Sequence, residues 1–165
     1  MIDQTVLGTL NKCQMLSLAC NAIDKMRPMP PLRNLRVLAL SRNKIRRING
    51  LDEIGDTLEE LWLSYNQIDT LNGLHPCRAL KVLYLSNNKI RRMEELDKLR
   101  DNPKLINVLF MGNPIYEGKQ SVQYGRDDIN LCDAQLDVLK RLTNLEVIDG
   151  KTVTLDDRSK LGLGE

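Results

Sequence analysis

Residues of the types that carry catalysis or hold metal ions are few in this chain and do not group together. Its one histidine, His75, precedes Pro76 and has no serine or cysteine nucleophile with an acidic partner patterned around it. The four cysteines show neither CxxC pairing nor the spacing of metal ligands: Cys13, Cys20, Cys77 and Cys132. No phosphate-cradling GxxxxGKS/T motif and no HxExxH-like metal motif is present. We predict that the chain is not an enzyme and uses no cofactor, metal ion or small-molecule substrate.

The aromatic side chains instead suit protein binding. Aromatic residues make up only 4% of the chain, yet its single tryptophan and two of its four tyrosines fall among regularly spaced leucines: Trp62, Tyr65 and Tyr84. Rigid aromatic anchors inside a polar rim are typical of the centres of protein interfaces. The stretch 58–66, LEELWLSYN, holds two of these anchors. Its value for binding depends on a backbone that presents them on one exposed surface.

The spacing of leucines and asparagines supplies such a backbone. The pattern LxxLxLxxN, with further apolar residues two and five positions later, recurs around five asparagines: Asn21, Asn43, Asn66, Asn88 and Asn113. A period of about 22 residues with this signature indicates leucine-rich repeats, in which each repeat gives one short parallel strand. Because no repeat can bury its apolar edge alone, neighbouring repeats must stack into one core. We predict an α/β leucine-rich repeat solenoid of about five 22-residue repeats with a C-terminal helical cap.

The chain divides into four expected segments. Residues 1–12 form a partial N-terminal cap, 13–118 the repeats, 119–150 the C-terminal cap, and 151–165 a short tail or helix. The cap should contain a helix that begins at Asp133 as N-cap and presents Leu136, Leu139 and Leu142 on one face. Since a solenoid needs its first coil covered, residues 1–10 form a minimal cap or the natural protein begins upstream of Met1, and we favour the second.

Strand geometry selects the side chains available to a partner. Alternate residues of a strand point to opposite sides, so the residues between the core leucines face outward. We name this surface the concave face and predict that it binds a partner through Met15, Val37, Ala39, Arg42, Glu60, Trp62, Tyr65, Val82, Tyr84, Asn87, Asn107 and Leu109. The alternative is that strand propensity alone favours Trp, Tyr and Val at these positions.

Charge distribution points to a second surface and narrows the function classes. Six basic residues recur at one phase of the repeat and should line one edge: Lys44, Arg46, Arg47, Lys89, Arg91 and Arg92. They suit acidic protein tails or an acidic polymer, or they only keep the solenoid soluble.

A net charge of +2 argues against nucleic-acid binding driven by bulk electrostatics. No apolar run is long enough to span a membrane, and the unclustered cysteines favour an intracellular protein.

Five segments carry a resemblance to a known family. They are DTLEELWLSYNQI at 56–68, LKVLYLSNNKI at 80–90, GNPIY at 112–116, VLKRLTNL at 138–145, and Asp149 with Gly150. On these segments the chain resembles the leucine-rich light-chain family of axonemal outer-arm dynein, over nearly its whole length. The resemblance implies a non-catalytic subunit that binds the motor unit of a dynein heavy chain at the microtubule-binding end of its stalk and tunes ciliary or flagellar beating.

The same resemblance implies where the protein acts and which residues serve it. It places the protein in the cytoplasm, cytoskeleton and axoneme. The expected partner is a dynein heavy chain, which the sheet face contacts, and tubulin is a second candidate partner. It also assigns regulation to a C-terminal helix, matched here by Asp156, Asp157 and Arg158. Lys151 and Thr154 replace a methionine and an aspartate expected in the family, and the family's N-terminal helical cap is missing from this chain.

Two alternative functions remain open on the sequence. A phosphatase-regulating leucine-rich subunit is expected to have a longer array of repeats than the five found here. A component like the leucine-rich protein of the U2 ribonucleoprotein particle shares the cap and the repeat length, but the nearly neutral net charge argues against it.

Overall fold

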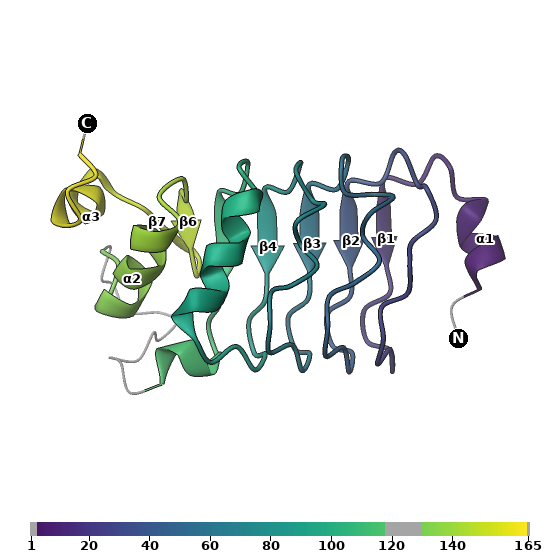
Figure 1. Cartoon of the computed structure of the whole chain (residues 1–165), viewed down its shortest axis with the longest axis horizontal. Helices are drawn as coiled ribbons and strands as arrows, with labels where there is room; N and C mark the ends of the chain where they lie inside the picture. The colour runs from purple at the N-terminus through teal and green to yellow at the C-terminus, as the bar shows by residue number, and fades with distance from the viewer. Residues whose placement is uncertain (1–2, 118–129, 165) are drawn as a thin grey trace.

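The computed structural model describes residues 3–117 and 130–164 as a leucine-rich repeat solenoid, which confirms the predicted fold class. Its strands form one seven-stranded sheet in chain order (Figure 1). They are β1 (Met15–Ser17), β2 (Val37–Ala39), β3 (Glu60–Trp62), β4 (Val82–Tyr84), β5 (Asn107–Leu109), β6 (Val147–Ile148) and β7 (Lys151–Thr152). Strands β1 to β6 are parallel and β7 is antiparallel to β6. The chain thus advances by one strand per repeat.

The middle residue of each strand points into the core. Leu16, Leu38, Leu61, Leu83 and Val108 are paired in register across five strands. From Leu38 onward these side chains are 0% exposed, as are most of the leucines and isoleucines that flank them. One continuous apolar core therefore runs along the solenoid, as the stacking argument requires.

The predicted asparagines link each coil to the one before it. The Asn66 amide nitrogen donates to the carbonyls of Leu40 and Leu63, both at 3.0 Å, while its oxygen accepts from the N–H of Ile45 at 2.9 Å. Asn43, Asn88 and Asn113 repeat this arrangement at 2.8 to 3.1 Å. Each carboxamide satisfies backbone groups that would otherwise be buried without partners.

The convex side is built mainly from short turns, as predicted. Residues 28–31, which include three prolines, contain no helix, and the longest helical segment of the repeats is the 3₁₀ helix η1 (Met93–Asp101). A second 3₁₀ turn, η2 (Pro114–Tyr116), follows the last asparagine. These turns pack closely on the preceding coil. Gly73, at φ +93°, would place an added Cβ 2.2 Å from the Ile48 carbonyl oxygen.

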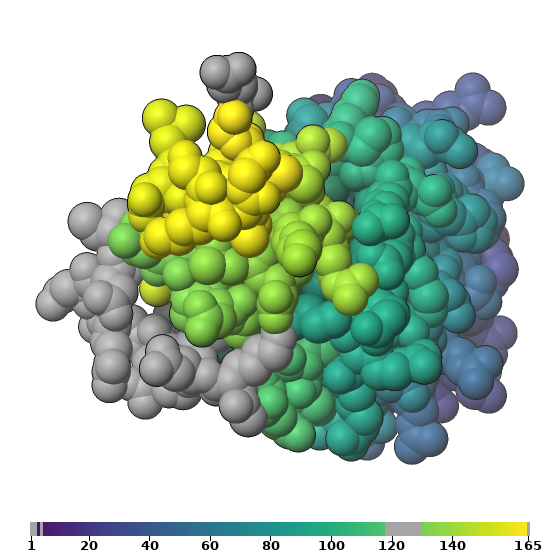
Figure 2. Space-filling model, turned by 60° about the vertical axis from the view of Figure 1, so that its left-hand side comes forward, coloured from purple at the N-terminus to yellow at the C-terminus, as the bar shows by residue number. Residues whose placement is uncertain are grey.

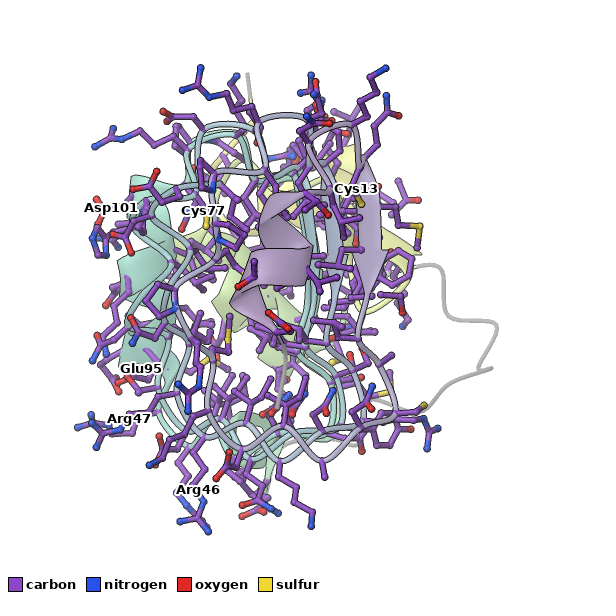
Figure 3. The ribbon with its side chains drawn as sticks, turned by 90° about the vertical axis from the view of Figure 1, so that its right-hand side faces the viewer. Cys13, Arg46, Arg47, Cys77, Glu95 and Asp101 are labelled. Carbon is purple, nitrogen blue, oxygen red and sulfur yellow. The ribbon has the colours of Figure 1, made fainter. Side chains whose placement is uncertain are left out.

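The N-terminal end carries a small cap. Helix α1 (Gln4–Gly8) begins after Asp3, whose carboxylate accepts from the N–H groups of Thr5 and Val6, and it lies over the end of the solenoid (Figure 3). Within the described residues only Leu7 of α1 is buried, whereas Val6 is 58% exposed. The first coil stays partly exposed at Cys13, Leu16 and Leu18. Of the expected minimal cap, Leu7 alone contributes to the core, and Ile2 lies outside the described residues.

At the other end, helix α2 (Asp133–Arg141) lies against the last coils, and η1 is its neighbour (Figure 2). One expectation was wrong, because Asp133 is the first helical residue and the N-cap is Cys132, which forms a reciprocal capping box with Gln135. The predicted apolar face is mostly confirmed: Leu139 and Leu142 are buried, while Leu136 is only partly covered. Ala134, Gln135 and Val138 complete the buried side of the helix.

A buried aspartate joins this cap to the repeats. Asp149 accepts from the backbone N–H groups of Phe110 and Met111 at 2.7 and 2.9 Å, and from the Tyr116 hydroxyl at 2.7 Å. Gln135 of α2 donates to the same carboxylate at 3.3 Å. Burial, and then the nearby charge of Asp149, raise the pKa of Tyr116, so its hydroxyl remains a donor at all ordinary pH values.

We predict that Gly73→Ala lowers the free energy of unfolding by about 2 kcal/mol or more, because the added methyl group meets a carbonyl of the preceding coil in a left-handed conformation. Gly8→Ala is the matched control, since Gly8 has no atom within 4 Å of the added group and lies in α1. Urea unfolding followed by circular dichroism measures both. Equal midpoints for the two variants would contradict the close coil packing.

Candidate partner-binding face

The strand register gathers the predicted site residues into columns on the concave face. The first strand positions pair across the sheet as Met15, Val37, Glu60, Val82 and Asn107. The third positions pair as Ser17, Ala39, Trp62, Tyr84 and Leu109. Apart from Met15 and Ser17, which are exposed, and Ala39, these side chains are half-buried. Backbone pairing alone therefore brings residues from five repeats onto one surface.

The centre of this surface is an aromatic pair. The rings of Trp62 and Tyr84 stack with centroids 6.1 Å apart and planes 25° from parallel. This geometry is favourable for aromatic contacts. The indole Nε1 of Trp62 donates to Glu60 Oε2 at 3.0 Å. Glu60 thus fixes the orientation of the indole, and both large side chains present a partner with a surface that is already ordered.

A third column follows the strands, at the residue before each asparagine. Cys20, Arg42, Tyr65 and Asn87 all adopt left-handed backbone angles, with φ between 54° and 59°. Gly112 has φ +75° at the same phase. The Arg42 guanidinium lies 4.5 Å from the centroid of the Tyr65 ring, within cation–π range. Tyr65 is 48% exposed, so this pair extends the aromatic surface toward its polar rim.

One predicted site residue does not fit. Ala39 has the expected register beside Trp62, but it is only 3% exposed, because a methyl group between larger neighbours offers almost no surface. It is a spacer in the face and cannot serve as a contact. Met15, by contrast, is 54% exposed at the N-terminal edge.

A charged row beside the face escaped prediction. Glu59 accepts from Arg36 at 2.9 Å and from Lys81 at 2.8 Å, joining three repeats at the residue before each strand. The Lys81 ammonium, followed by Arg36, lowers the pKa of the Glu59 carboxyl. Alternating charges at intervals of 22 and 23 residues were the available signal in the sequence. The row gives the face a polar border.

The predicted regulatory tail is a structural part of the cap. Helix α3 (Leu155–Lys160) places Asp157 at 0% exposure, where its carboxylate accepts from the Leu131 N–H at 3.1 Å and the Thr154 hydroxyl at 2.7 Å. Arg158 donates to the carbonyls of Thr143 and Leu145. These hydrogen bonds attach α3 to the rest of the cap. Of the three predicted tail residues, only Asp156 is exposed, and it pairs with Lys160 at 2.7 Å.

Residues 3–117 and 130–164 hold few features of a metal site, a membrane span or a reactive thiol. No group of three or more His, Cys, Asp or Glu side chains there is placed to hold a metal ion, and no helix there is long and apolar enough to cross a bilayer. Burial raises the pKa of the Cys77 thiol to about 12, so this cysteine stays protonated and unreactive. His75 lies exposed on a turn.

Sequence comparisons agree with the repeat architecture. A family model described as "Leucine Rich repeats (2 copies)" matches residues 56–100. Dynein axonemal light chain 1 of Chlamydomonas reinhardtii is 46% identical over 154 residues, which cover 93% of this chain and 75% of that protein. The Danio rerio protein of the same name is 47% identical over 156 residues, covering 94% of this chain and 77% of that protein.

Two solved structures have a fold similar to that of this chain. Internalin C2 of Listeria monocytogenes has a TM-score of 0.61 and 26% identity, covering 92% of this chain and 56% of that one. A chain of the Drosophila melanogaster SNF/U2A′ complex has a TM-score of 0.54 and 20% identity, covering 93% and 69%. At 20% identity the second likeness concerns the fold alone, so it does not favour the ribonucleoprotein alternative.

We predict that Asp157→Ala lowers the free energy of unfolding by about 2 to 4 kcal/mol, because it leaves buried donors on Leu131 and Thr154 without an acceptor. Asp156→Ala is the matched control, one residue away, exposed and engaged only in a surface ion pair. Chemical unfolding at pH 7 measures both. Equal stabilities would show that α3 is a loosely attached tail.

The difference in unfolding free energy between wild type and Asp157→Ala should also depend on pH. Burial acts to raise the pKa of Asp157, but hydrogen bonds from Thr154 and the Leu131 N–H outweigh it and lower the pKa. A depressed pKa in the folded state stabilises the protein above the pKa of the unfolded chain, about 3.9 for an aspartate. The stability difference between wild type and Asp157→Ala should therefore be complete at pH 7 and shrink only below about pH 4.

Proposed function

We infer the function of this chain from its family and from its exposed face. The chain belongs to the dynein axonemal light chain 1 family. It is accordingly a leucine-rich repeat protein of the axonemal dynein machinery. We propose that it is a non-catalytic subunit that binds the heavy-chain motor unit of outer-arm dynein, at the microtubule-binding region of the stalk, through the concave face. By this binding it modulates ciliary or flagellar motility.

The Trp62–Tyr84 stack is the observation that carries the choice of surface. The two rings lie at the middle of the sheet, in strands β3 and β4, with polar side chains of Glu60, Asn87 and Arg42 around them. Interfaces concentrate binding energy in such aromatic clusters, where a polar border excludes water. An apolar aromatic surface left without a partner would instead favour aggregation.

The rigidity of the face suits a regulatory subunit. Each strand is paired with its neighbours, and Glu60 already holds the indole, so little conformational entropy is lost when a partner binds. A stiff surface can bind one conformation of a motor segment better than another. It then shifts the population of motor states by the difference in binding free energy, with no chemical step of its own.

We predict that the double variant Trp62→Ala, Tyr84→Ala fails to capture an outer-arm dynein heavy chain from ciliated cells, whereas wild type captures it. The affinity for a recombinant stalk fragment of that heavy chain should fall by about thirtyfold or more, the loss expected for one strong interface anchor. Mass spectrometry of the captured proteins and direct titration measure the two effects.

The control is a double variant of exposed residues on the convex turn, His75→Ala and Arg78→Ala. It should bind like wild type, and circular dichroism should show that all three proteins are folded. Capture of phosphatase or U2-particle proteins without any dynein heavy chain would contradict the proposed function. Full retention of the heavy chain by the folded Trp62, Tyr84 variant would contradict the proposed surface.

A further inference from the structure

An open groove of about 590 Å³ lies away from the concave face. Ten residues line it: Arg47, Ile48, Asp69, Thr70, Asn72, Lys89, Arg91, Arg92, Glu95 and Lys98. We call it the basic groove. Figure 3, which looks along the solenoid, shows Arg47 and Glu95 on the side opposite the strand beside Cys13. A partner on the concave face would leave this groove accessible.

The basic groove concentrates positive charge. Five of its side chains are cationic and two are anionic, while the whole chain carries a net charge of only +2. The cations come from two repeats, because Arg47 follows the second asparagine while Lys89, Arg91, Arg92 and Lys98 follow the fourth. Of the six basic residues predicted to line one edge, Arg47, Lys89, Arg91 and Arg92 also line the groove.

The groove has an ordered floor. Glu95 is 5% exposed, and its Oε2 accepts from Lys98 Nζ at 2.6 Å, the Thr70 hydroxyl at 2.8 Å and the Leu71 N–H at 2.9 Å. Arg92 lies 3.3 Å from the other oxygen. Burial acts to raise the pKa of Glu95, but these hydrogen bonds outweigh it and bring the pKa to about 2. Glu95 is therefore ionised and fully used in holding Lys98 and Arg92 in place.

The remaining cations have no such role. Within the part of the chain that the structure describes, the side chains of Arg47, Lys89 and Arg91 make no ion pair or hydrogen bond, and all three are exposed. Cations that serve only solubility are usually interspersed with acids across a surface. Here five cations lie over an ordered floor, and a bound anion would lower their mutual repulsion.

We propose that the basic groove binds an extended acidic peptide segment, rich in Glu or Asp, with Arg47 and Arg91 each holding a carboxylate. Coils two repeats apart are separated by roughly 10 Å, twice the strand spacing. In an extended peptide, residues three apart are separated by roughly the same distance. Carboxylates three residues apart on such a chain can therefore reach Arg47 and Arg91, and guanidinium groups bind them in a fork geometry.

The arrangement favours carboxylates on a peptide over a dense polyanion. Asp69 and Glu95 stand among the cations, and they would repel closely spaced phosphates more strongly than separated single charges. Arg47 belongs to the second repeat and Arg91 to the fourth, so separated single charges on one chain match them better than one phosphate group does. This second surface is independent of the concave face and of the heavy chain proposed to bind there.

The test is fluorescence polarisation with the full chain and a labelled octa-glutamate peptide, at low and at moderate salt. The double variant Arg47→Glu, Arg91→Glu should weaken binding by about tenfold or more. Arg33→Glu with Arg78→Glu is the matched control, because it makes the same change in net charge at exposed residues outside the groove. It should keep at least about half of the wild-type affinity. An octa-glutamine peptide should not bind.

Three outcomes would overturn the proposal. Equal losses in both double variants would show that only bulk charge attracts the peptide. Wild-type affinity in the groove variant would show that the peptide binds elsewhere. Tighter binding of a singly phosphorylated serine peptide or a short single-stranded RNA would assign the groove to phosphate. The Trp62, Tyr84 variant should bind the acidic peptide like wild type, which separates this result from the test of the concave face.

Discussion

The column of asparagines is the constraint on which the rest of the structure depends. Asn66 donates to a carbonyl of its own coil and to one of the preceding coil, and it accepts an N–H from that preceding coil. Because both ends of the carboxamide are used, neighbouring coils can stack in only one register. Every repeat must then place its leucines inward and its alternate residues outward at equivalent positions along its strand. The concave face follows from that register, and so does the alignment of cations from separate repeats in the basic groove.

One period therefore yields two surfaces with different chemistry. Residues inside the strands, such as Trp62 and Tyr84, make an ordered aromatic face, while residues three or four positions after each asparagine, such as Arg47 and Arg91, make a charged groove. The first suits a large apolar contact of low entropic cost, and the second suits a flexible acidic chain held by charge. Because the two surfaces are separate, the heavy chain proposed for the concave face would leave the basic groove free for a second protein.

The repeat and the stacked aromatic pair were predictable because each depends on residues at a fixed interval. Residues 62 and 84 are one repeat apart, so their proximity needs only the period. The burial of Ala39 was not predictable, since it depends on the size of its neighbours across the sheet. The burial of Asp157 was likewise not predictable, because its partner Leu131 is 26 residues away and has no periodic relation to it. The floor of the basic groove depends on η1, which interrupts the repeat, so the roles of Glu95 and Lys98 were missed.

Trp62 allows the central claim to be tested without a mutation. It is the only tryptophan of the chain, so 5-fluorotryptophan labelling gives one ¹⁹F resonance at the centre of the concave face. On titration with an unlabelled heavy-chain stalk fragment, that resonance should shift or broaden as the complex forms, and a soluble paramagnetic agent should relax it less in the complex. If sedimentation shows that the complex forms while the resonance and its relaxation stay unchanged, binding through this face is contradicted.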